Sequence, residues 1–308
     1  MVPFKRIAEL RMNPGSKNNS CISNVQKGWY EVNAKNFFFT ILAANCLFGL
    51  MACAYSGVTT TAEETKGVSA TGGIQFDFAD AASLLVIKPV ENKVLTLKKF
   101  RVGTGRNRLL IVGVQAEERG KRNVSDMVIS SVTYGGHALI LIPNSEVQLS
   151  SIYFKDGAEY FLKVALYYLL NPPSGTHDIT VTFAGRVPSG NVGAMSLFNT
   201  EQAAPVNLVT NQKRNPSKKK EIITKITTRN DRAWVIDILG CGKKTRLENK
   251  TKDYTQRFQA TEKTGGKSML VGGTLSDLSA GEVSLHWVQK VFIINRLAHV
   301  AVEIAPHK

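Results

Sequence analysis

The chain has 308 residues, 43% of them apolar, which is enough for one large or two small domains with a real core and excludes an intrinsically disordered protein. Lysine and arginine number 39 against 24 acidic residues, and the formal charge of +15 favours anionic partners such as acidic polysaccharide, lipid headgroups or nucleic acid. Cysteine occurs only at positions 21, 46, 53 and 241, so no disulfide framework supports the fold and no zinc-ligand spacing is present.

An apolar segment dominates the N-terminal part of the chain. Residues 1–34 form a basic and polar leader, and Phe37–Ala54 then reads FFFTILAANCLFGLMACA, an uncharged run of 18 residues closely preceded by Lys35. This order is typical of an export signal, so we expect residues 35–54 to be a signal or a membrane-anchor helix. The 36 residues before the run are long for a signal, which leaves two alternatives, a misassigned start or a cytoplasmic tail of an uncleaved anchor.

The end of this run, Leu50-Met51-Ala52-Cys53, resembles the lipobox of bacterial lipoproteins. The resemblance implies that the chain is cleaved before Cys53 and that a diacylglyceryl group on this cysteine attaches it to a membrane. The following residue, Ala54, is not the aspartate that retains lipoproteins at the inner membrane. Residues 55–73 are small and polar without apolar periodicity, which predicts a flexible tether.

The rest of the chain alternates short β-type runs with glycine, asparagine and proline turns, and no amphipathic helix interrupts them. In His177–Phe183, the apolar side chains of Ile179, Val181 and Phe183 fall on one face and two threonines on the other, the period-two pattern of a half-buried strand. Val164–Leu170 is apolar on both faces, which suits a central strand covered on both sides.

These patterns predict an all-β fold, an antiparallel β-sandwich over residues 74–305. Pro172, Pro173 and Gly175 lie between two of the strands and force the chain to turn. The strands are expected at Ile74–Phe78, Leu84–Ile87, Lys93–Phe100, Arg108–Gln115, Met127–Tyr134, His137–Ile142, Glu159–Leu170, His177–Phe183, Val192–Phe198, Ile222–Thr227, Ala233–Leu239, Tyr254–Gln259, Ser268–Thr274, Val283–Gln289 and Leu297–Ile304.

Two stretches roughly 124 residues apart echo each other. Asn107-Arg108-Leu-Leu-Ile-Val-Gly-Val and Asp231-Arg232-Ala-Trp-Val-Ile-Asp-Ile each place a turn residue and an arginine before a strand of buried character. The echo indicates either two matching halves or a chance similarity between two strands, so we use it only to locate central strands.

A basic segment lies between these two stretches. Asn211–Lys220 reads NQKRNPSKKK and carries five positive charges, and we expect it to be a solvated loop that joins two strands. No aromatic residue interleaves with these charges, so single-stranded nucleic acid is a poor fit. The alternative is an electrostatic contact with phosphate or an anionic glycan through Lys213, Arg214, Lys218, Lys219 and Lys220.

Several stretches together resemble a poorly characterised family of secreted or cell-surface domains of bacteria. The stretches are NRLLIVGVQAE (Asn107–Glu117), ISSVTYGGHALI (Ile129–Ile140), YYLLNPPSGTHDITVTF (Tyr167–Phe183) and GAMSLFNTEQAAPVN (Gly193–Asn207). The resemblance covers roughly Lys98–Ile304 and implies a jelly-roll-like sandwich. The shared motifs are turn and core signals without catalytic residues, and the basic character of this chain departs from the near-neutral charge expected of such domains.

Sequence motifs give little support for catalysis. The histidines form no H-E-x-x-H, no G-x-S-x-G is present, and no glutamate begins the E-x-D-x-x-E of sandwich-fold glycan hydrolases. Glu117 and Glu118 diverge on a strand, so a retaining carboxylate pair would need one of them to meet a distant acid such as Asp237. No cofactor is expected, because calcium-type spacing is absent among Asp77, Asp80, Asn123 and Asp126.

Binding suits such a scaffold better, because aromatic side chains on loops or on one face can stack on sugar rings. The candidates are Tyr134, Tyr153 and Tyr254, although Tyr134 also suits the core, where we expect Trp234 and Trp287. We therefore expect an exported protein of the bacterial envelope, lipid-anchored or secreted, with a non-catalytic binding or structural role towards a glycan, another anionic ligand or an envelope protein. The alternative is a glycan-active enzyme whose carboxylates assemble in three dimensions.

Overall fold

The computed structural model describes residues 72–84, 93–152, 157–214, 221–242, 245–261, 268–290 and 296–308. This part of the chain consists of antiparallel strands and one short 3-10 helix, η1 (Lys121–Met127), which confirms the expected all-β fold. No helix in these ranges is long and apolar enough to cross a membrane. The leader, the expected apolar helix and nearly all of the tether lie outside the described residues.

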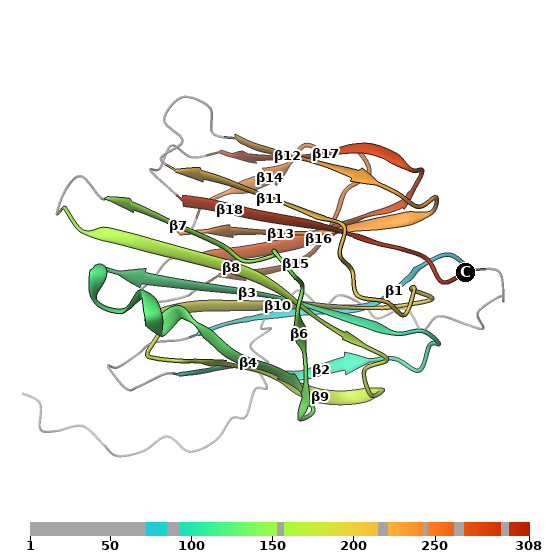
Figure 1. Cartoon of the computed structure of the whole chain (residues 1–308), viewed down its shortest axis with the longest axis horizontal. Helices are drawn as coiled ribbons and strands as arrows, with labels where there is room; N and C mark the ends of the chain where they lie inside the picture. The colour runs from blue at the N-terminus through green and yellow to red at the C-terminus, as the bar shows by residue number, and fades with distance from the viewer. Residues whose placement is uncertain are drawn as a thin grey trace, which may run out of the picture. The chain divides into compact units, whose positions relative to one another are not determined.

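The first half of the fold is a sandwich of two sheets (Figure 1). Its strands are β1 (Gln75–Ser83), β2 (Val94–Val102), β3 (Leu109–Arg119), β4 (Ile129–Tyr134), β5 (His137–Ala138), β6 (Ile140–Leu141), β7 (Val147–Ile152), β8 (Glu159–Leu170), β9 (Gly175–Phe183) and β10 (Ser189–Phe198). The first inner sheet has the order β1-β10-β3-β8, and β6 and β7 pair with successive parts of β8. The first outer sheet has the order β2-β9-β4-β5.

The second half is another sandwich, so the region expected to form one sandwich contains two. Its strands are β11 (Leu208–Arg214), β12 (Glu221–Thr228), β13 (Ala233–Cys241), β14 (Leu247–Asn249), β15 (Thr255–Thr261), β16 (Met269–Leu278), β17 (Gly281–Gln289) and β18 (Arg296–Ile304). The second inner sheet has the order β11-β18-β13-β16-β15, and the second outer sheet has the order β12-β17-β14.

The two sandwiches have equivalent strands. The orders β1-β10-β3-β8 and β11-β18-β13-β16 correspond, as do β2-β9-β4 and β12-β17-β14. The turn between β8 and β9 has positive φ at Asn171 and Gly175, and the turn between β16 and β17 has positive φ at Asp277 and Gly281, with the same spacing. Residue-by-residue equivalence can therefore be read from the strand registers.

The strand registers confirm that the two similar stretches are equivalent strands, and they correct the alignment of the two stretches. The sequence echo located β3 and β13, which are the equivalent central strands of the two inner sheets. The alignment was off by one residue, because the positive φ lies at Asn107 (51°) in one half and at Arg232 (58°) in the other. With this shift Ile111 corresponds to Ile236, and both side chains face the same core. A one-residue slip would have placed each on the opposite face.

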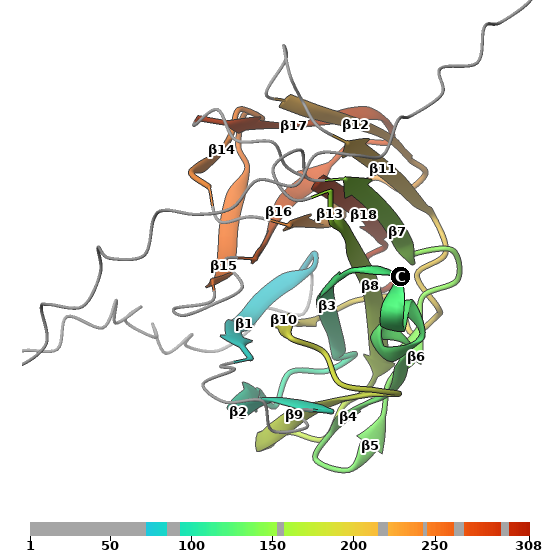
Figure 2. The ribbon, with the colours of Figure 1, turned by 90° about the vertical axis from the view of Figure 1, so that its left-hand side faces the viewer.

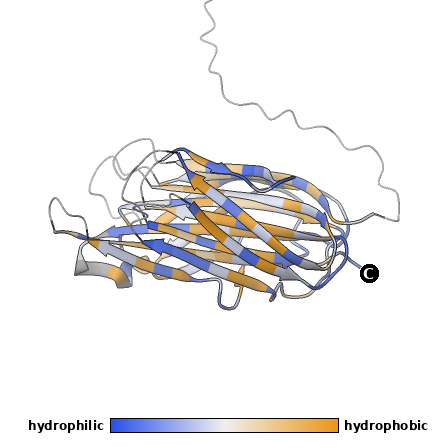
Figure 3. Cartoon of the chain, turned by 90° about the horizontal axis from the view of Figure 1, so that it is seen from above, coloured by the Kyte–Doolittle hydropathy of each residue, from blue (hydrophilic) through white to orange (hydrophobic). Residues whose placement is uncertain are grey.

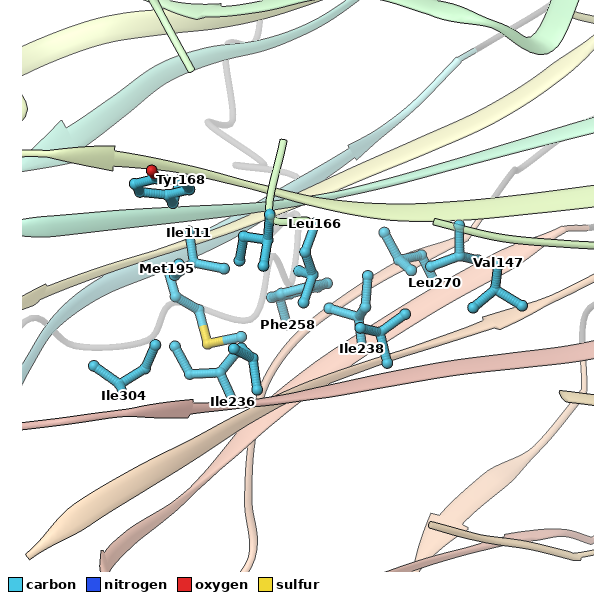
Figure 4. Close-up of a cluster of buried hydrophobic side chains, with 14 of the residues drawn as sticks. Ile111, Val147, Leu166, Tyr168, Met195, Ile236, Ile238, Phe258, Leu270 and Ile304 are labelled. Carbon is cyan, nitrogen blue, oxygen red and sulfur yellow. The ribbon is translucent and has the colours of Figure 1, made fainter. Parts of the chain in front are cut away.

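The four sheets stack as layers, with the two inner sheets face to face (Figures 1 and 2). Apolar residues alternate with polar ones along many strands, as Figure 3 shows, because successive side chains point to opposite faces. Strands of the inner sheets are apolar on both faces since both faces are covered. Figure 4 shows the core between the inner sheets, to which the first half contributes Leu166 and Met195 and the second contributes Ile238 and Leu270.

Contacts between the inner sheets follow a local two-fold arrangement. Strand β7 contacts β11 and β18, and its counterpart β15 contacts β1 and β10. Strand β8 contacts β13 and β18, and its counterpart β16 contacts β3 and β10. Gly113 and Ile238 are equivalent residues that meet each other, as residues on a two-fold axis do, since a Cβ atom on Gly113 would lie 2.9 Å from Cγ2 of Ile238. The interface has the geometry of an isologous dimer within one chain.

Several predicted elements differ from the structure. The segment 211–214, expected in a loop, belongs to β11, and neither β7 nor β14 was predicted. These edge strands are short or strongly polar, so they lack the apolar run that marks a buried strand. Leu84 follows β1 outside any strand, and the rest of the strand expected at Leu84–Ile87 lies outside the described residues.

The contact at Gly113 predicts the effect of overpacking on the two-fold axis. We expect Gly113→Ala to lower the free energy of unfolding by about 1–3 kcal/mol, because its Cβ atom must displace the side chain of Ile238. Adding Ile238→Ala should restore part of this loss in urea unfolding. Gly190→Ala is the matched control, since its nearest neighbour would be 3.5 Å away, an ordinary contact. Equal losses for the two glycine variants would contradict the close approach of the sheets.

Candidate functional site

The structure places Tyr134 in the core of the first sandwich. Its side chain is buried, with 0% exposure, and its ring packs edge-on against Phe100 and His177. Its hydroxyl donates a hydrogen bond to the carbonyl oxygen of Gly175 at 2.9 Å. Burial, with a contribution from Asp77, raises the pKa of Tyr134 to about 12. Tyr134 therefore stabilises the turn before β9, and its ring is not available to stack on a sugar.

The other candidates are dispersed. Lys213 donates from Nζ to the carbonyl oxygen of Glu221 at 2.7 Å, which links β11 to β12, and Arg214 is exposed at the end of β11. Tyr254 is half-buried just before β15, and its hydroxyl points inward, to Asp237. Trp234 and Trp287 are core residues, as expected. The candidates Cys53, Tyr153, Lys218, Lys219 and Lys220 lie outside the described residues.

A buried polar network occupies the interior of the second sandwich, and we call it the Asp237 network. Asp237, on β13, is 0% exposed and accepts hydrogen bonds at both carboxylate oxygens. The Tyr254 hydroxyl donates to Oδ1 at 2.6 Å, and the Trp287 indole donates to Oδ2 at 2.8 Å. His299 Nε2 lies 2.8 Å from Oδ2, and its Nδ1 lies 2.6 Å from Oγ1 of Thr224.

The network joins strands of both sheets of the second sandwich. Thr224 and Trp287 belong to the outer sheet, on β12 and β17, and Asp237 and His299 belong to the inner sheet, on β13 and β18. Because the carboxylate oxygens of Asp237 accept hydrogen bonds, His299 donates from Nε2, and its Nδ1 forms the hydrogen bond with the Thr224 hydroxyl. Burial, together with the Asp237 carboxylate, raises the pKa of Tyr254 well above its ordinary value, so its hydroxyl remains a donor.

The order carboxylate, imidazole, hydroxyl resembles the connectivity of a catalytic triad, but the burial argues against that chemistry. Thr224 is 3% exposed and His299 is 0% exposed, so a substrate would not reach the hydroxyl in this arrangement. The network is therefore internal. From the sequence alone, Asp237 was considered only as a distant acid for Glu117 or Glu118. A carboxylate in the middle of the otherwise apolar strand AWVIDILGC was the one sequence feature that indicated a buried polar network.

A second buried polar cluster lies between the two sandwiches. Arg296, on β18, forms an ion pair through Nη2 with Glu117, on β3, and both side chains are less than one-tenth exposed. The same guanidinium donates to Ser151 Oγ and to the Gly242 carbonyl oxygen, each at 3.1 Å. Nearby, Gln115 Nε2 donates to the Cys241 carbonyl oxygen at 3.1 Å. Burial lowers the pKa of Arg296, and the Glu117 carboxylate partly opposes this effect.

The structure does not bring Glu117 and Asp237 to a common site. Glu117 faces the interface between the inner sheets, where it contacts Arg296. Asp237 alternates with Ile236 and Ile238, which face that interface, and so it points to the opposite side of the second inner sheet. The backbone of this sheet therefore separates the two carboxylates, and the pair proposed for a glycan-active enzyme is not formed.

Other acidic groups also act within the fold. Asp77 Oδ2 accepts from the Gly103 amide at 2.6 Å and from Ser196 Oγ at 2.8 Å. Glu303 accepts from the backbone amides of Arg229 and Asn230. Its pKa would rise by burial, but these hydrogen bonds and one from Asn207 outweigh burial and hold it below its ordinary value. Within the described ranges, no group of three or more His, Cys, Asp or Glu residues is placed to hold a metal ion.

Basic side chains gather along β2, at the edge of the first outer sheet. Lys98, Lys99 and Arg101 are exposed there, and Lys93 is exposed just before the strand. Lys98 and Lys99 form a bulge, in which Lys99 has φ 58° and donates its amide to Asp178 at 2.8 Å. A bulge and lysines are common on edge strands because they prevent pairing with another chain, and they also present cations outward.

Comparison with known proteins gives no relative. No protein-family model, no curated protein and no solved structure matches the chain.

The buried ion pair predicts a strong effect of one substitution on stability. We expect Glu117→Gln to lower the free energy of unfolding by about 3–5 kcal/mol, because Arg296 stays buried without its countercharge. Lys225→Gln, which removes one partner of the exposed pair Lys225–Glu282, should cost less than about 1 kcal/mol. Urea unfolding at neutral pH measures both. A small loss for Glu117→Gln would show that the interface does not depend on the pair.

Proposed function

We propose that the chain is an exported protein of the bacterial envelope, and that its two β-sandwiches have a non-catalytic binding or structural role towards a glycan or another anionic surface ligand. One observation carries the proposal. The buried carboxylates of Asp237 and Glu117 are used inside the fold, whereas the cations of β2 are exposed, although the Arg101 guanidinium also lies 5.3 Å from the centroid of the Phe78 ring. The formal charge of +15 favours an anionic partner for these cations.

The strand order supports a finer description of each half as a jelly roll. If the first sandwich is counted without β6 and β7, it has eight strands, with sheet orders 1-8-3-6 and 2-7-4-5. This is the order produced when two Greek keys fold into two sheets. The second sandwich follows the same path, with β15 at the position that β6 and β7 take along β8. Jelly rolls occur in many binding and assembly proteins, so this description agrees with the proposal without selecting a ligand.

A location at the envelope rests on the sequence. The lipobox-like Leu50-Met51-Ala52-Cys53 at the end of an apolar run supports export and lipid attachment, and a polar tether would place the sandwiches away from the membrane. Outside the cytoplasm, nucleic acid is a poor candidate ligand and acidic polysaccharides are a good one. The sandwiches would then face the anionic polymers of the envelope.

Lipid attachment can be tested on the full chain expressed in a bacterium. We expect mass spectrometry to find a mature N-terminus at a diacylated Cys53, and labelled palmitate to be incorporated. Cys53→Ser should abolish the label, and Cys46→Ser, in the same apolar run, should retain it. An uncleaved chain with an unmodified Cys53 would contradict lipid attachment and leave only a membrane anchor or another route of export.

Ligand binding can be tested with a uronic-acid polysaccharide as the anionic probe and dextran as the neutral one. We expect binding to the anionic probe only, weaker at higher salt, because exposed charges are screened. The triple variant Lys98→Gln, Lys99→Asn, Arg101→Gln should bind about tenfold more weakly. Asn is chosen at position 99 because it tolerates the positive φ of this bulge.

A matched control removes the same charge elsewhere. Lys225→Gln, Lys250→Gln and Lys290→Gln together change the net charge equally, but each of these lysines already pairs with a glutamate on the second outer sheet. We expect this control to bind nearly as well as the parent protein. Equal losses in both triple variants would indicate a general charge effect, and undiminished binding in both would direct attention to Lys218, Lys219 and Lys220.

A further inference from the structure

The two sandwiches differ in the polarity of the residues at equivalent interior positions. Strand registers assign to each residue of the Asp237 network a counterpart in the first sandwich. Every counterpart is a buried apolar residue of the first sandwich's core. The pairs are Thr224 with Leu97, Asp237 with Val112, Tyr254 with Leu139, Trp287 with Val181, and His299 with Val192.

This comparison shows that the fold does not require polar groups at these places. In the first sandwich, leucine and valine side chains occupy the equivalent interior, and they bury their surface without needing hydrogen-bond partners. In the second sandwich a carboxylate and an imidazole are taken out of water, which is costly unless every partner is in place. Replacing such buried polar sets by apolar ones is often neutral or stabilising in proteins. A contribution to net stability is therefore a poor explanation for the network.

Two sandwiches with equivalent strands in one chain face a specific hazard in folding. Strand β17 matches β9 and β18 matches β10 in their pairing partners and nearly in their length, so each can offer the same backbone hydrogen bonds to the wrong sheet. Exchange of equivalent elements is a characteristic misfolding route of repeated domains. Because the backbone hydrogen bonds are the same in the native and the exchanged pairing, the side chains must disfavour the exchange.

The network supplies this discrimination. If β18 took the place of β10, His299 would enter a core of apolar side chains with no carboxylate to accept its hydrogen bond. If β10 took the place of β18, Val192 would replace His299, and the Asp237 carboxylate would lose that donor while remaining buried. Exchange of β17 with β9 has the same effect through the Trp287 indole. Each exchange leaves a buried polar group unpaired, whereas the native pairing satisfies the set.

We propose that the Asp237 network is a pairing lock, a set of mutually hydrogen-bonded side chains that keeps the strands of the second sandwich from exchanging with those of the first. The pairing lock disfavours the strand-exchanged fold through buried side chains, so it is compatible with any ligand that binds the outer surface. It also explains why the carboxylate of Asp237 and the imidazole of His299 are closed to solvent, because discrimination depends on burial.

The experiment reports strand exchange directly by thiol crosslinking. Thr96 lies opposite Thr180 on the outer face of the first outer sheet, and His286 is the counterpart of Thr180 on the second outer sheet. Three sheet spacings of about 10 Å separate the two outer sheets, so a short bifunctional crosslinker does not join positions 96 and 286 in the native fold. Thr96→Cys with His286→Cys therefore detects exchange, and Thr96→Cys with Thr180→Cys detects native pairing.

The reporters are placed in the full chain with Cys21, Cys46 and Cys53 changed to serine and the buried Cys241 retained. The test variant carries the apolar set of the first sandwich, Thr224→Leu, Asp237→Val, Tyr254→Leu, Trp287→Val and His299→Val. Each protein is refolded from urea at low concentration and then crosslinked. We expect the 96–286 product, within one chain or in exchanged dimers, to rise at least about tenfold in the test variant.

A second variant covers the case in which five substitutions prevent folding. Asp237→Val with His299→Val removes the carboxylate that accepts from both Trp287 on β17 and His299 on β18, and so removes the discrimination at both strands, while it keeps the large rings of Trp287 and Tyr254. It should raise the 96–286 product in the same direction, while the 96–180 product confirms that the first sandwich has formed. A 96–286 yield no higher than in the parent protein, in whichever variant shows the 96–180 product, would overturn the proposal.

Discussion

The packing of the two inner sheets against each other is the constraint on which the rest of the structure depends. Each inner sheet is covered on both sides, and this requires strands that are apolar on both faces. The close approach at Gly113 is possible because this residue has no side chain to oppose Ile238. Once this interface is set, each of the two outer sheets is left with one face towards water.

Polar groups in the interior follow the same geometry. Glu117 and Arg296 join the two sandwiches where the inner sheets meet, and the Asp237 network joins inner and outer sheets within the second sandwich only. In the Asp237 network the carboxylate, indole and imidazole all form hydrogen bonds with one another or with Thr224 and Tyr254, as burial requires. The interior chemistry of this chain therefore serves the arrangement of its strands, and a role for the protein is better sought on its surface.

The two outer faces have diverged in charge. On the second outer sheet, lysines are paired with glutamates, as in Lys225 with Glu282 and Lys250 with Glu248. Along β2 of the first outer sheet, Lys98 and Arg101 are exposed, and the neighbouring strands carry small hydroxyl side chains, three threonines on β9 and one threonine and two serines on β4. A protein built from two equivalent sandwiches thus presents two different surfaces, and the exposed cations of β2 lie on only one of them.

The sequence by itself determined the class of fold and most of its central strands, because periodic apolar residues such as Ile179 and Val181 report the side of a strand that is buried. It also placed Trp234 and Trp287 in the core. It did not determine β11, β7 or β14, since edge strands need no apolar run, and it misjudged Asn211–Arg214 for that reason. Only the tertiary structure decided that there are two sandwiches, that Tyr134 is buried, and that Asp237 meets His299. These facts depend on contacts between residues far apart in the chain, to which local patterns are insensitive.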